Sequence, residues 1–327
     1  MGLIITKVPF RLPLGGGATD LPSYYSRFGG QLITASINKY MYISINQPIT
    51  SDTIRLYYAY TEEVNTVDEI EHNIIRESLK LHNIEPPLEI GSMAEITAGT
   101  GMGSSSAFAV GLLAGLNIIN HRIVSPKDIA EEACKVEIEL VGKPIGKQDQ
   151  YAVALGGINE LQINQDGYVN VSRLNLSGEF IRELENRLLI FYTHSTRDAN
   201  IVLAEQGKKI SDNEITDKMH YIKEIGVAVK KALIDEDIDR LGRLFDLHWK
   251  TKRSMSDLMT SGEIDNYYQV AKNSGAIGGK IMGAGGGGML LLCCESNRRK
   301  ELISVMESFG LKYMDFRFEF DGVKQII

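Results

Sequence analysis

Short runs of apolar residues recur through the first part of the chain, and they are rich in β-branched and aromatic side chains. Such runs are typical of strands, and we predict strands at residues 3–10, 31–37, 40–45 and 88–93. Residues 67–83 instead carry apolar side chains at helical spacing and predict a helix. The chain therefore begins as a mixed unit that is rich in strands.

A capped helix is predicted from Ser125 to Leu140. Ser125 and Asp128 flank a proline at the first helical position, a combination that favours a helix start. Its apolar residues fall on one face: Ile129, Ala133, Val136 and Leu140. The helix is expected to end at Gly142, before a loop GKPIGKQDQ that contains Asp149.

We predict a domain boundary near residue 180, ahead of a change in the texture of the sequence at about residue 197. Strands are predicted before the boundary at 156–163 and 168–175, and a strand at 187–193 precedes a mostly helical, charged stretch. The remaining predicted elements are helices within 197–259, strands at 276–283 and 289–294, a helix at 298–309 and a last strand. Because 327 residues suit two domains of about 150 residues each, we expect domains over 1–180 and 181–327.

Composition narrows the classes of function. Charged residues form 24% of the chain and hydrophobic residues 43%, which indicates a packed globular protein. The formal net charge of −7 disfavours nucleic-acid binding. Three cysteines, two of them inside an apolar run, indicate reduced thiols and a cytoplasmic location. The six histidines lack zinc-ligand spacing, and no apolar run is long enough to span a bilayer, so a membrane partner is not expected.

A glycine-rich loop at residues 99–106 runs directly into an apolar helix. Its glycines permit unusual backbone angles, and the helix start presents N–H groups and a positive dipole end to an anion. Serine hydroxyls in the first turn can bind a phosphate oxygen or Mg²⁺. The loop lacks the GKS or GKT of a Walker A motif and the GxGxxG spacing of a dinucleotide fold. Seen alone, it could also be a turn with a serine cap.

Two further glycine-rich segments lie near the ends of the chain, RLPLGGGATD at residues 11–20 and KIMGAGGGG at residues 280–288. Each alone is usually a tight turn or a close backbone contact. Together, the three segments suggest that backbone converges on one polyanionic ligand.

The three motifs in this order resemble those of the GHMP kinases, a family that includes galactokinase, homoserine kinase and mevalonate kinase. The resemblance covers nearly the whole chain. It implies a two-domain α+β fold, with a first domain similar to a ribosomal-protein fold, a ferredoxin-like second domain, and an active site in the cleft between them. It also implies ATP as the phosphate donor, with residues 283–288 closing the site. The residues expected to wrap the ATP phosphates are Gly99, Thr100, Gly101, Met102, Gly103, Ser104, Ser105 and Ser106.

The resemblance also implies roles for two carboxylates. Asp149 is similar to an aspartate of galactokinase-like segments, and we expect it to act as the base or to orient the acceptor hydroxyl. Glu137 matches the family glutamate that binds Mg²⁺ opposite the serine of the phosphate loop, here Ser105. Helix geometry alone does not distinguish Glu137 from Glu132 and Glu139, which also flank the apolar face.

The same resemblance implies which residues bind the acceptor. Arg11 is expected near the transferred phosphate, where a planar fork of donors is suitable, and Asp20 is expected to bind sugar hydroxyls. The other expected substrate contacts are Gly16, Gly17, Arg197, Gly285 and Gly286. A phosphate on the acceptor would need partners of its own, for which Arg197, Lys252 and Arg253 are candidates. Backbone N–H groups at residues 15–17 are the alternative.

Longer stretches narrow the resemblance further. GGGATDLPSYYSRFGG, FYTHSTRDANIVL and residues 252–288 look like the D-glycero-D-manno-heptose 7-phosphate kinases, with a departure at His194, where a small residue is expected. This implies phosphorylation of the anomeric hydroxyl of heptose 7-phosphate, giving the 1,7-bisphosphate of nucleotide-heptose biosynthesis. A kinase for fucose, galactose or an amino sugar is the alternative. A non-catalytic sensor of sugar and ATP on the same fold is a further one.

Overall fold

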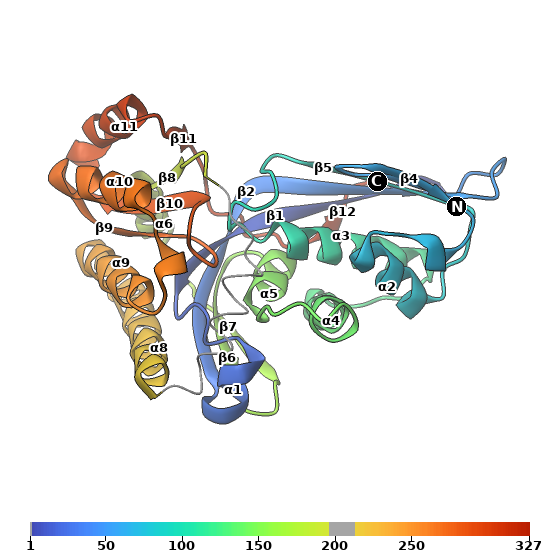
Figure 1. Cartoon of the computed structure of the whole chain (residues 1–327), viewed down its shortest axis with the longest axis horizontal. Coiled ribbons are helices and arrows are strands. Elements are labelled where there is room, and N and C mark those ends of the chain that lie inside the picture. Colours follow the sequence, from blue (N-terminus) through green and yellow to red (C-terminus); the bar gives the residue numbers. More distant parts are fainter. Residues whose placement is uncertain (1, 196–212) are drawn as a thin grey trace.

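The computed structural model describes residues 2–195 and 213–327, which form two α+β units (Figure 1). The first unit is built on an eight-stranded sheet with the main order β12-β1-β2-β5-β3-β4. At its centre, β1 (Ile4–Gly15) pairs with β2 (Gly30–Asn46) along nearly its whole length. The other strands of this sheet are β3 (Ile54–Tyr57), β4 (Thr61–Val64), β5 (Leu88–Ala94), β6 (Ile158–Ile163), β7 (Val169–Arg173) and β12 (Lys324–Gln325).

β2 belongs to two halves of this sheet. Its residues 41–46 pair with β5, whereas its residues 30–35 pair with β6, to which β7 is added. The strands predicted separately at 31–37 and 40–45 are therefore one bent strand. The pairing of β2 with β1 shifts beside Pro9 and again beside Pro13. Proline has no N–H for a strand ladder, so β1 tolerates these residues where its pairing is irregular.

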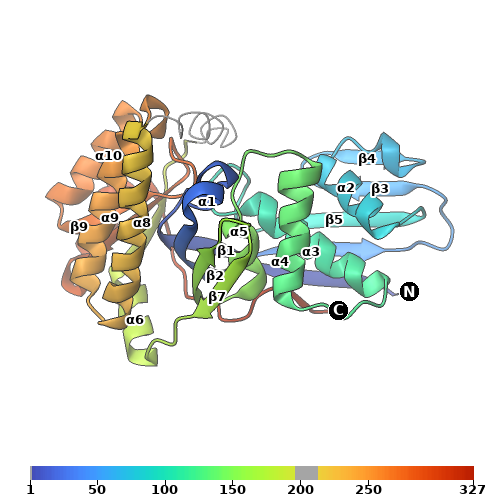
Figure 2. The same cartoon turned by 90° about the horizontal axis from the view of Figure 1, so that it is seen from below.

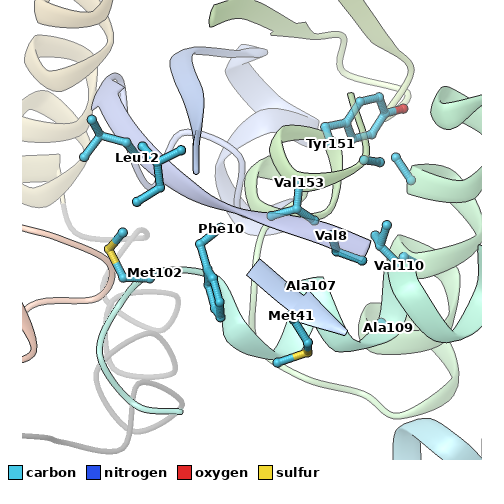
Figure 3. Close-up of a cluster of buried hydrophobic side chains, with 14 of the residues drawn as sticks. Val8, Phe10, Leu12, Met41, Met102, Ala107, Ala109, Val110, Tyr151 and Val153 are labelled. Atoms are coloured by element: carbon cyan, nitrogen blue, oxygen red, sulfur yellow. The ribbon is translucent and has the colours of Figure 1, made fainter. Parts of the chain in front are cut away.

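The helices of the first unit include those predicted within 67–83, after the loop at 99–106, and within 125–140. They are α1 (Pro22–Phe28), α2 (Asn73–His82), α3 (Ser104–Ile119), α4 (Pro126–Cys134), a π-helical turn (Lys135–Leu140) and α5 (Gln148–Leu155). The helices α2 to α5 lie on one face of the sheet (Figures 1 and 2). Figure 3 shows Val8 and Phe10 of β1 in this core with Ala107 and Val110 of α3. α3 is apolar on all sides because it is buried between the sheet and its neighbouring helices.

The second unit is built on a four-stranded antiparallel sheet with the order β11-β8-β10-β9, a ferredoxin-like arrangement. Its elements are α6 (Gly178–Arg187), β8 (Leu188–Tyr192), α8 (Asn213–Ile234), α9 (Ile238–Arg253), α10 (Gly262–Asn273), β9 (Ala276–Ile281), β10 (Met289–Cys294), α11 (Arg299–Ser308) and β11 (Lys312–Met314). The two-domain α+β fold expected from the sequence is confirmed.

Both faces of the second sheet are buried. Leu188 and Ile190 of β8 share a core with α8 and α9, whereas Leu189 and Phe191 share another core with α10 and α11. Neighbouring residues of a strand point to opposite faces, so side chains at successive positions of such a strand are all buried. This explains the uninterrupted run MLLLCC of β10.

The two units are joined by α8 and by the end of the chain. α8 packs on β1 and β2, and a Cβ on Gly15 would lie 3.0 Å from the Cβ of Val229 in α8. After β11 the chain returns to the first sheet, where β12 pairs with β1 and the N–H of Ile326 donates to the carbonyl of Ile5 at 2.8 Å. The passage between sheets lies between β7 and β8, around residue 180. The last residues of the 181–327 segment nevertheless belong to the first sheet.

Two glycines set the position of α9 on β9. A Cβ on Gly278 of β9 would lie only 2.0 Å from the carbonyl oxygen of Gly242 in α9. Helix and strand therefore approach to backbone contact. This contact holds His248 and Lys252 of α9 beside Lys280 of β9, and all three side chains line the cleft described below.

We expect Gly278→Ala to lower the free energy of unfolding by about 3 kcal/mol, because the added methyl group forces α9 away from β9. The matched control is Gly262→Ala at the start of α10, where a Cβ would meet nothing within 4 Å. The control should change the free energy of unfolding by less than about 0.5 kcal/mol. Urea unfolding measures both, and equal stability of the two variants would contradict the close approach.

Candidate active site

A cleft of about 990 Å³ is lined by residues of both units. The loop at residues 99–103 and the start of α3 form its middle. One end, near α2, is lined by Tyr58, His72, Asn73 and Phe108. The other end, near α9, is lined by Asp20, His248, Lys252 and Lys280. The cleft therefore has an aromatic end and a charged end.

The loop before α3 is held in a backbone shape that suits glycine. Gly99, Gly101 and Gly103 have φ values of 78°, 75° and 80°. A Cβ on Gly101 would lie 2.5 Å from the carbonyl oxygen of Met282 in the second unit. Met102 is fully buried in the core near Phe10 and Leu12, and it anchors the loop (Figure 3). The N–H groups of the first turn of α3 have no acceptors within the helix, so the loop ends in a helix start that suits an anion.

The guanidinium of Arg11 connects β1 with this loop and with α5. Its Nε donates to Asp149 Oδ1 at 2.7 Å, its Nη2 to Asp149 Oδ2 at 2.9 Å, and its Nη1 to the carbonyl of Gly101 at 2.5 Å. Arg11 is only 4% exposed, whereas the Asp149 side chain is 28% exposed. Each carboxylate oxygen keeps a lone pair, so Asp149 can still accept a hydrogen bond from a ligand in the cleft.

Asp149 lies in the first turn of α5 and not in the loop predicted for it. The helix start has no side-chain cap of its own at Lys147, but Asp20 Oδ2 accepts from the N–H of Gln148 at 2.9 Å. Asp20 therefore supplies the cap from a distant part of the chain. It fixes where α5 begins and, with it, the position of Asp149. Burial raises the pKa of Asp20 and the Asp149 charge raises it further, against the opposing effect of the Gln148 N–H.

Glu137 lies in the π-helical turn after α4. The N–H of Val141 donates to the carbonyl of Val136 at 2.9 Å, which is the i to i+5 bond of a π-helix. The wider turn rotates the chain relative to α4. As a result Glu137 is fully buried, and Leu140, which was predicted on the apolar face, is 43% exposed. Such turns often occur at functional sites.

Donors surround the Glu137 carboxylate. Ser105 Oγ donates to Oε1 at 2.5 Å, and Ser106 Oγ and Gln150 Nε2 donate to Oε2 at 2.8 and 2.7 Å. Lys143 Nζ lies 3.1 Å from Oε1 and 2.5 Å from Ser105 Oγ. The carboxylate is thus fixed directly behind the start of α3.

The two other glutamates considered from the sequence point elsewhere. Glu132 pairs with Arg122 at 3.0 Å, and Glu139 is exposed. Glu137 and Ser105 offer the carboxylate and hydroxyl oxygens that Mg²⁺ prefers, beside the helix start that suits phosphate. No cluster of three or more His, Cys, Asp or Glu side chains that could hold a metal occurs within 2–195 and 213–327. Glu137 and Ser105 fit a Mg²⁺ ion that would take its remaining ligands from phosphate and water.

Two lysines and a histidine lie on the second unit's side of the cleft. Lys252 Nζ donates to the carbonyl of Gly283 at 2.5 Å, and Lys280 Nζ donates to the carbonyl of Leu14 at 2.8 Å. Burial lowers the pKa of Lys252 to about 8, and a nearby guanidinium adds to this effect. Burial also holds the pKa of Lys280 and that of His248 well below their usual values.

Most of the residues predicted for the site line the cleft. They are Arg11, Gly17, Asp20, Gly99, Gly101, Gly103, Ser104, Ser105, Ser106 and Asp149. Thr100, Met102, Glu137, Gly16, Gly285 and Gly286 do not line it. A Cβ on Gly16 would lie 1.9 Å from the carbonyl oxygen of Gln31, so this glycine serves the packing of the first unit. In the last glycine-rich loop, Gly283 and Ala284 face the cleft, and Arg197 lies outside the described residues.

Sequence reasoning missed four polar residues of the site: Lys143, Gln150, His248 and Lys280. Lys147, in the loop GKPIGKQDQ, donates from its Nζ to the carbonyl of Gly167 at 2.7 Å. Lys143, four residues earlier in the same loop, reaches Ser105 instead. Lys280 is the first residue of the KIMGAGGGG motif. Its place next to a glycine-rich loop was the one sequence signal that could have identified it as a site residue.

Family comparisons agree with this arrangement. A model described as GHMP kinases N terminal domain matches residues 65–157, and one described as GHMP kinases C terminal matches residues 229–311. The chain belongs to the GHMP kinases. It is therefore a kinase, and the relatives below support a sugar kinase of this family.

Several relatives match this GHMP kinase over most of their length. The D-glycero-alpha-D-manno-heptose 7-phosphate kinase of Campylobacter jejuni is 27% identical over 99% of each chain. The galactokinase of Pyrococcus furiosus is 25% identical over 87% of each chain. A crystal structure of a D-glycero-D-manno-heptose 1-phosphate kinase from Bacteroides thetaiotaomicron covers 99% of each chain with a TM-score of 0.82 and 24% identity, and it supports the fold. Within the described residues of this kinase, no helix is both long and apolar enough to cross a membrane.

Lys252→Met tests what the buried ammonium costs this GHMP kinase. The pKa of Lys252 is about 8 in the fold and 10.5 ordinarily, so its charge destabilises the fold below pH 8, and the cost disappears as pH rises to 10.5. We expect Lys252→Met to raise the free energy of unfolding by roughly 2 kcal/mol at pH 7, and by progressively less toward pH 10.5.

Denaturant unfolding at several pH values measures this difference. The control is Lys250→Met, because Lys250 lies on the same helix with 64% of its side chain exposed. The control should show no such dependence on pH. A Lys252→Met variant less stable than the parent at pH 7 would contradict the cost assigned to the buried charge.

Proposed function

We propose that this GHMP kinase transfers the γ-phosphoryl group of ATP, with Mg²⁺, to the anomeric hydroxyl of D-glycero-D-manno-heptose 7-phosphate. The product is the 1,7-bisphosphate of nucleotide-heptose biosynthesis. The observation that carries the proposal is the position of the Arg11–Asp149 pair in one cleft, between the anion-binding start of α3 and the lysines of α9 and β9. The heptose 7-phosphate kinase of Campylobacter jejuni, which matches the whole chain, supports the choice of acceptor.

The nucleotide side begins at the aromatic end of the cleft. The His72 and Phe108 rings lie 5.0 Å apart, and Tyr58 packs edge-on against His72 at 4.8 Å, so this end offers flat surfaces for a base. The ATP phosphates then lie against the glycine loop and the first turn of α3. Ser105 and Glu137 would hold Mg²⁺ there, and the ion would offset phosphate charge during transfer. Lys143 adds a positive charge beside them.

In this proposal the acceptor hydroxyl lies beside the Asp149 carboxylate. The acceptor oxygen forms the new bond to the γ-phosphorus while the bond from that phosphorus to the ADP oxygen breaks, and the hydroxyl proton is released through the Asp149 carboxylate. Arg11 holds this carboxylate by two parallel bonds, so its direction is fixed before the acceptor binds. Asp20 keeps α5 in register and faces the same end of the cleft, where sugar hydroxyls would lie.

Asp149→Asn is expected to lower kcat by at least about 100-fold while the dissociation constant for ATP stays nearly unchanged, because the amide cannot take the proton. A coupled ADP-release assay and nucleotide titration measure the two quantities. Asp166→Asn is the control, because Asp166 is exposed in the turn between β6 and β7. A near-normal kcat for Asp149→Asn would remove this residue from its role.

Glu137→Gln is expected to raise the Mg²⁺ concentration required for half-maximal turnover by at least about tenfold, because one anionic oxygen ligand is lost. Glu139→Gln is the matched control, since Glu139 lies two residues later in the same turn and is exposed. Magnesium titration of the initial rate measures both variants. If Glu137→Gln kept the parent's magnesium requirement, the assignment of the metal site would be wrong.

The acceptor is tested with a panel of phosphorylated and free sugars in the same ADP-release assay. We expect the highest kcat/KM with heptose 7-phosphate. A clear preference for an unphosphorylated sugar would favour the second candidate, a kinase similar to the galactokinase relative. No turnover with any sugar would favour a non-catalytic sensor, against which the retention of Glu137, Ser105 and Asp149 argues.

The three cysteines are free and buried, which supports a cytoplasmic location.

A further inference from the structure

One group of buried polar side chains at the charged end of the cleft has no role in the steps above. His248 and Lys252 lie one turn apart on α9, and Lys280 reaches the same face of α9 from β9, with its Nζ 5.1 Å from the Phe245 ring centroid. All three line the cleft, although His248, Lys252 and Lys280 are only 4%, 5% and 2% exposed. They place buried polar groups at the wall of the cleft where α9 packs against β9.

The hydrogen-bonding capacity of this group is largely unused. Each lysine donates to one backbone carbonyl, and neither makes an ion pair with any residue in the described parts of the chain. Neither ring nitrogen of His248 has a hydrogen-bond partner there. A lysine ammonium has three N–H donors, and buried polar groups are almost always satisfied. Unused donors that face a cleft therefore indicate a ligand with several acceptor oxygens.

Neither lysine at this end has a carboxylate at ion-pair distance within the described residues. Arg11 holds Asp149 by two bonds, and Asp20 accepts from the N–H of Gln148 and pairs with neither lysine. A dianion placed between the two lysines would offset the cost of their burial.

Lys280 of this group lies beside the glycine turn at residues 15–17. Lys280 donates to the carbonyl of Leu14, immediately before the turn at residues 15–17, and Gly17 of that turn lines the cleft with open space at its Cβ position. Lys252 lies nearer the glycine loop, because its Nζ donates to Gly283, whose backbone contacts Gly101. A substrate that reaches from Asp149 toward Lys280 and Gly17 would carry its anionic group away from the reacting hydroxyl.

We propose that His248, Lys252 and Lys280 form a subsite for a phosphomonoester on the acceptor, and that this subsite makes the kinase select sugar phosphates over free sugars. The inference rests on the sugar-kinase function proposed above and names the residues that select its acceptor. Arg253, which the sequence offered as a candidate, instead pairs with Asp265 at 3.2 Å on the exposed side of α9.

The test compares kcat/KM for heptose 7-phosphate with kcat/KM for the unphosphorylated heptose. We expect Lys280→Met to reduce the ratio of these two values by about 30-fold, because a charged hydrogen bond to the phosphate is lost. His248→Asn is the second variant, with a smaller reduction of several-fold. Arg253→Met, next to Lys252 but outside the cleft, is the control and should leave the ratio unchanged. Thermal melts establish that each variant is folded.

The outcomes separate this inference from the proposed function. If heptose 7-phosphate is the preferred acceptor and neither variant changes the ratio, the subsite is wrong while the function stands. If both variants slow the two acceptors equally through kcat, the group acts on the transferred phosphate and the subsite is also wrong. If another sugar phosphate is preferred and Lys280→Met still lowers the ratio, the subsite stands and the choice of heptose fails. A preference for free sugars that Lys280→Met does not alter overturns both.

Discussion

The buried fork of Arg11 is the interaction on which the site depends. Its donors reach the Asp149 carboxylate and the Gly101 carbonyl, so β1, the glycine loop and α5 meet at one cation. A buried guanidinium that loses an acceptor carries an uncompensated charge, so a displacement of any one of these segments disturbs the other two. A lysine could not replace it, because a single ammonium lacks the planar fork that fixes the direction of a carboxylate.

The second constraint is the contact between glycine-rich loops from the two units. A Cβ on Gly283 would lie 2.6 Å from the Cα of Gly101, and the N–H of Met289 donates to the carbonyl of Thr100 at 3.1 Å. These glycines therefore allow two backbones to touch, and only part of the last loop faces the cleft. The sequence suggested that all three glycine-rich segments converge on a ligand. In the structure, Gly16 and Gly288 serve protein packing, since a Cβ on Gly288 would lie 2.4 Å from the Thr100 oxygen.

The sequence predicted what local physics determines. The capping box at Ser125 and Asp128 is present, and α3 and β10 appear where apolar patterns placed them. It could not predict features that depend on distant contacts. The cap on α5 comes from Asp20, 128 positions away from Gln148, so the segment around Asp149 looked like a loop. The π-helical turn has no local signature, so the apolar face was extended one turn too far. α6 and α10 were missed because the charged residues within them obscured their apolar spacing.

The charged end of the cleft illustrates why a binding site can oppose the stability of its own fold. Pairing Lys252 and Lys280 with carboxylates would satisfy both ammonium groups, but an anionic ligand would then have to displace those carboxylates. Leaving the lysines with only backbone acceptors keeps them available, and burial depresses the pKa of each as a consequence. The rigid contact of α9 with β9 at Gly242 and Gly278 prevents the two charges from moving apart into solvent. The same glycine packing that brings helix and strand together therefore maintains a charge density that an anion can offset.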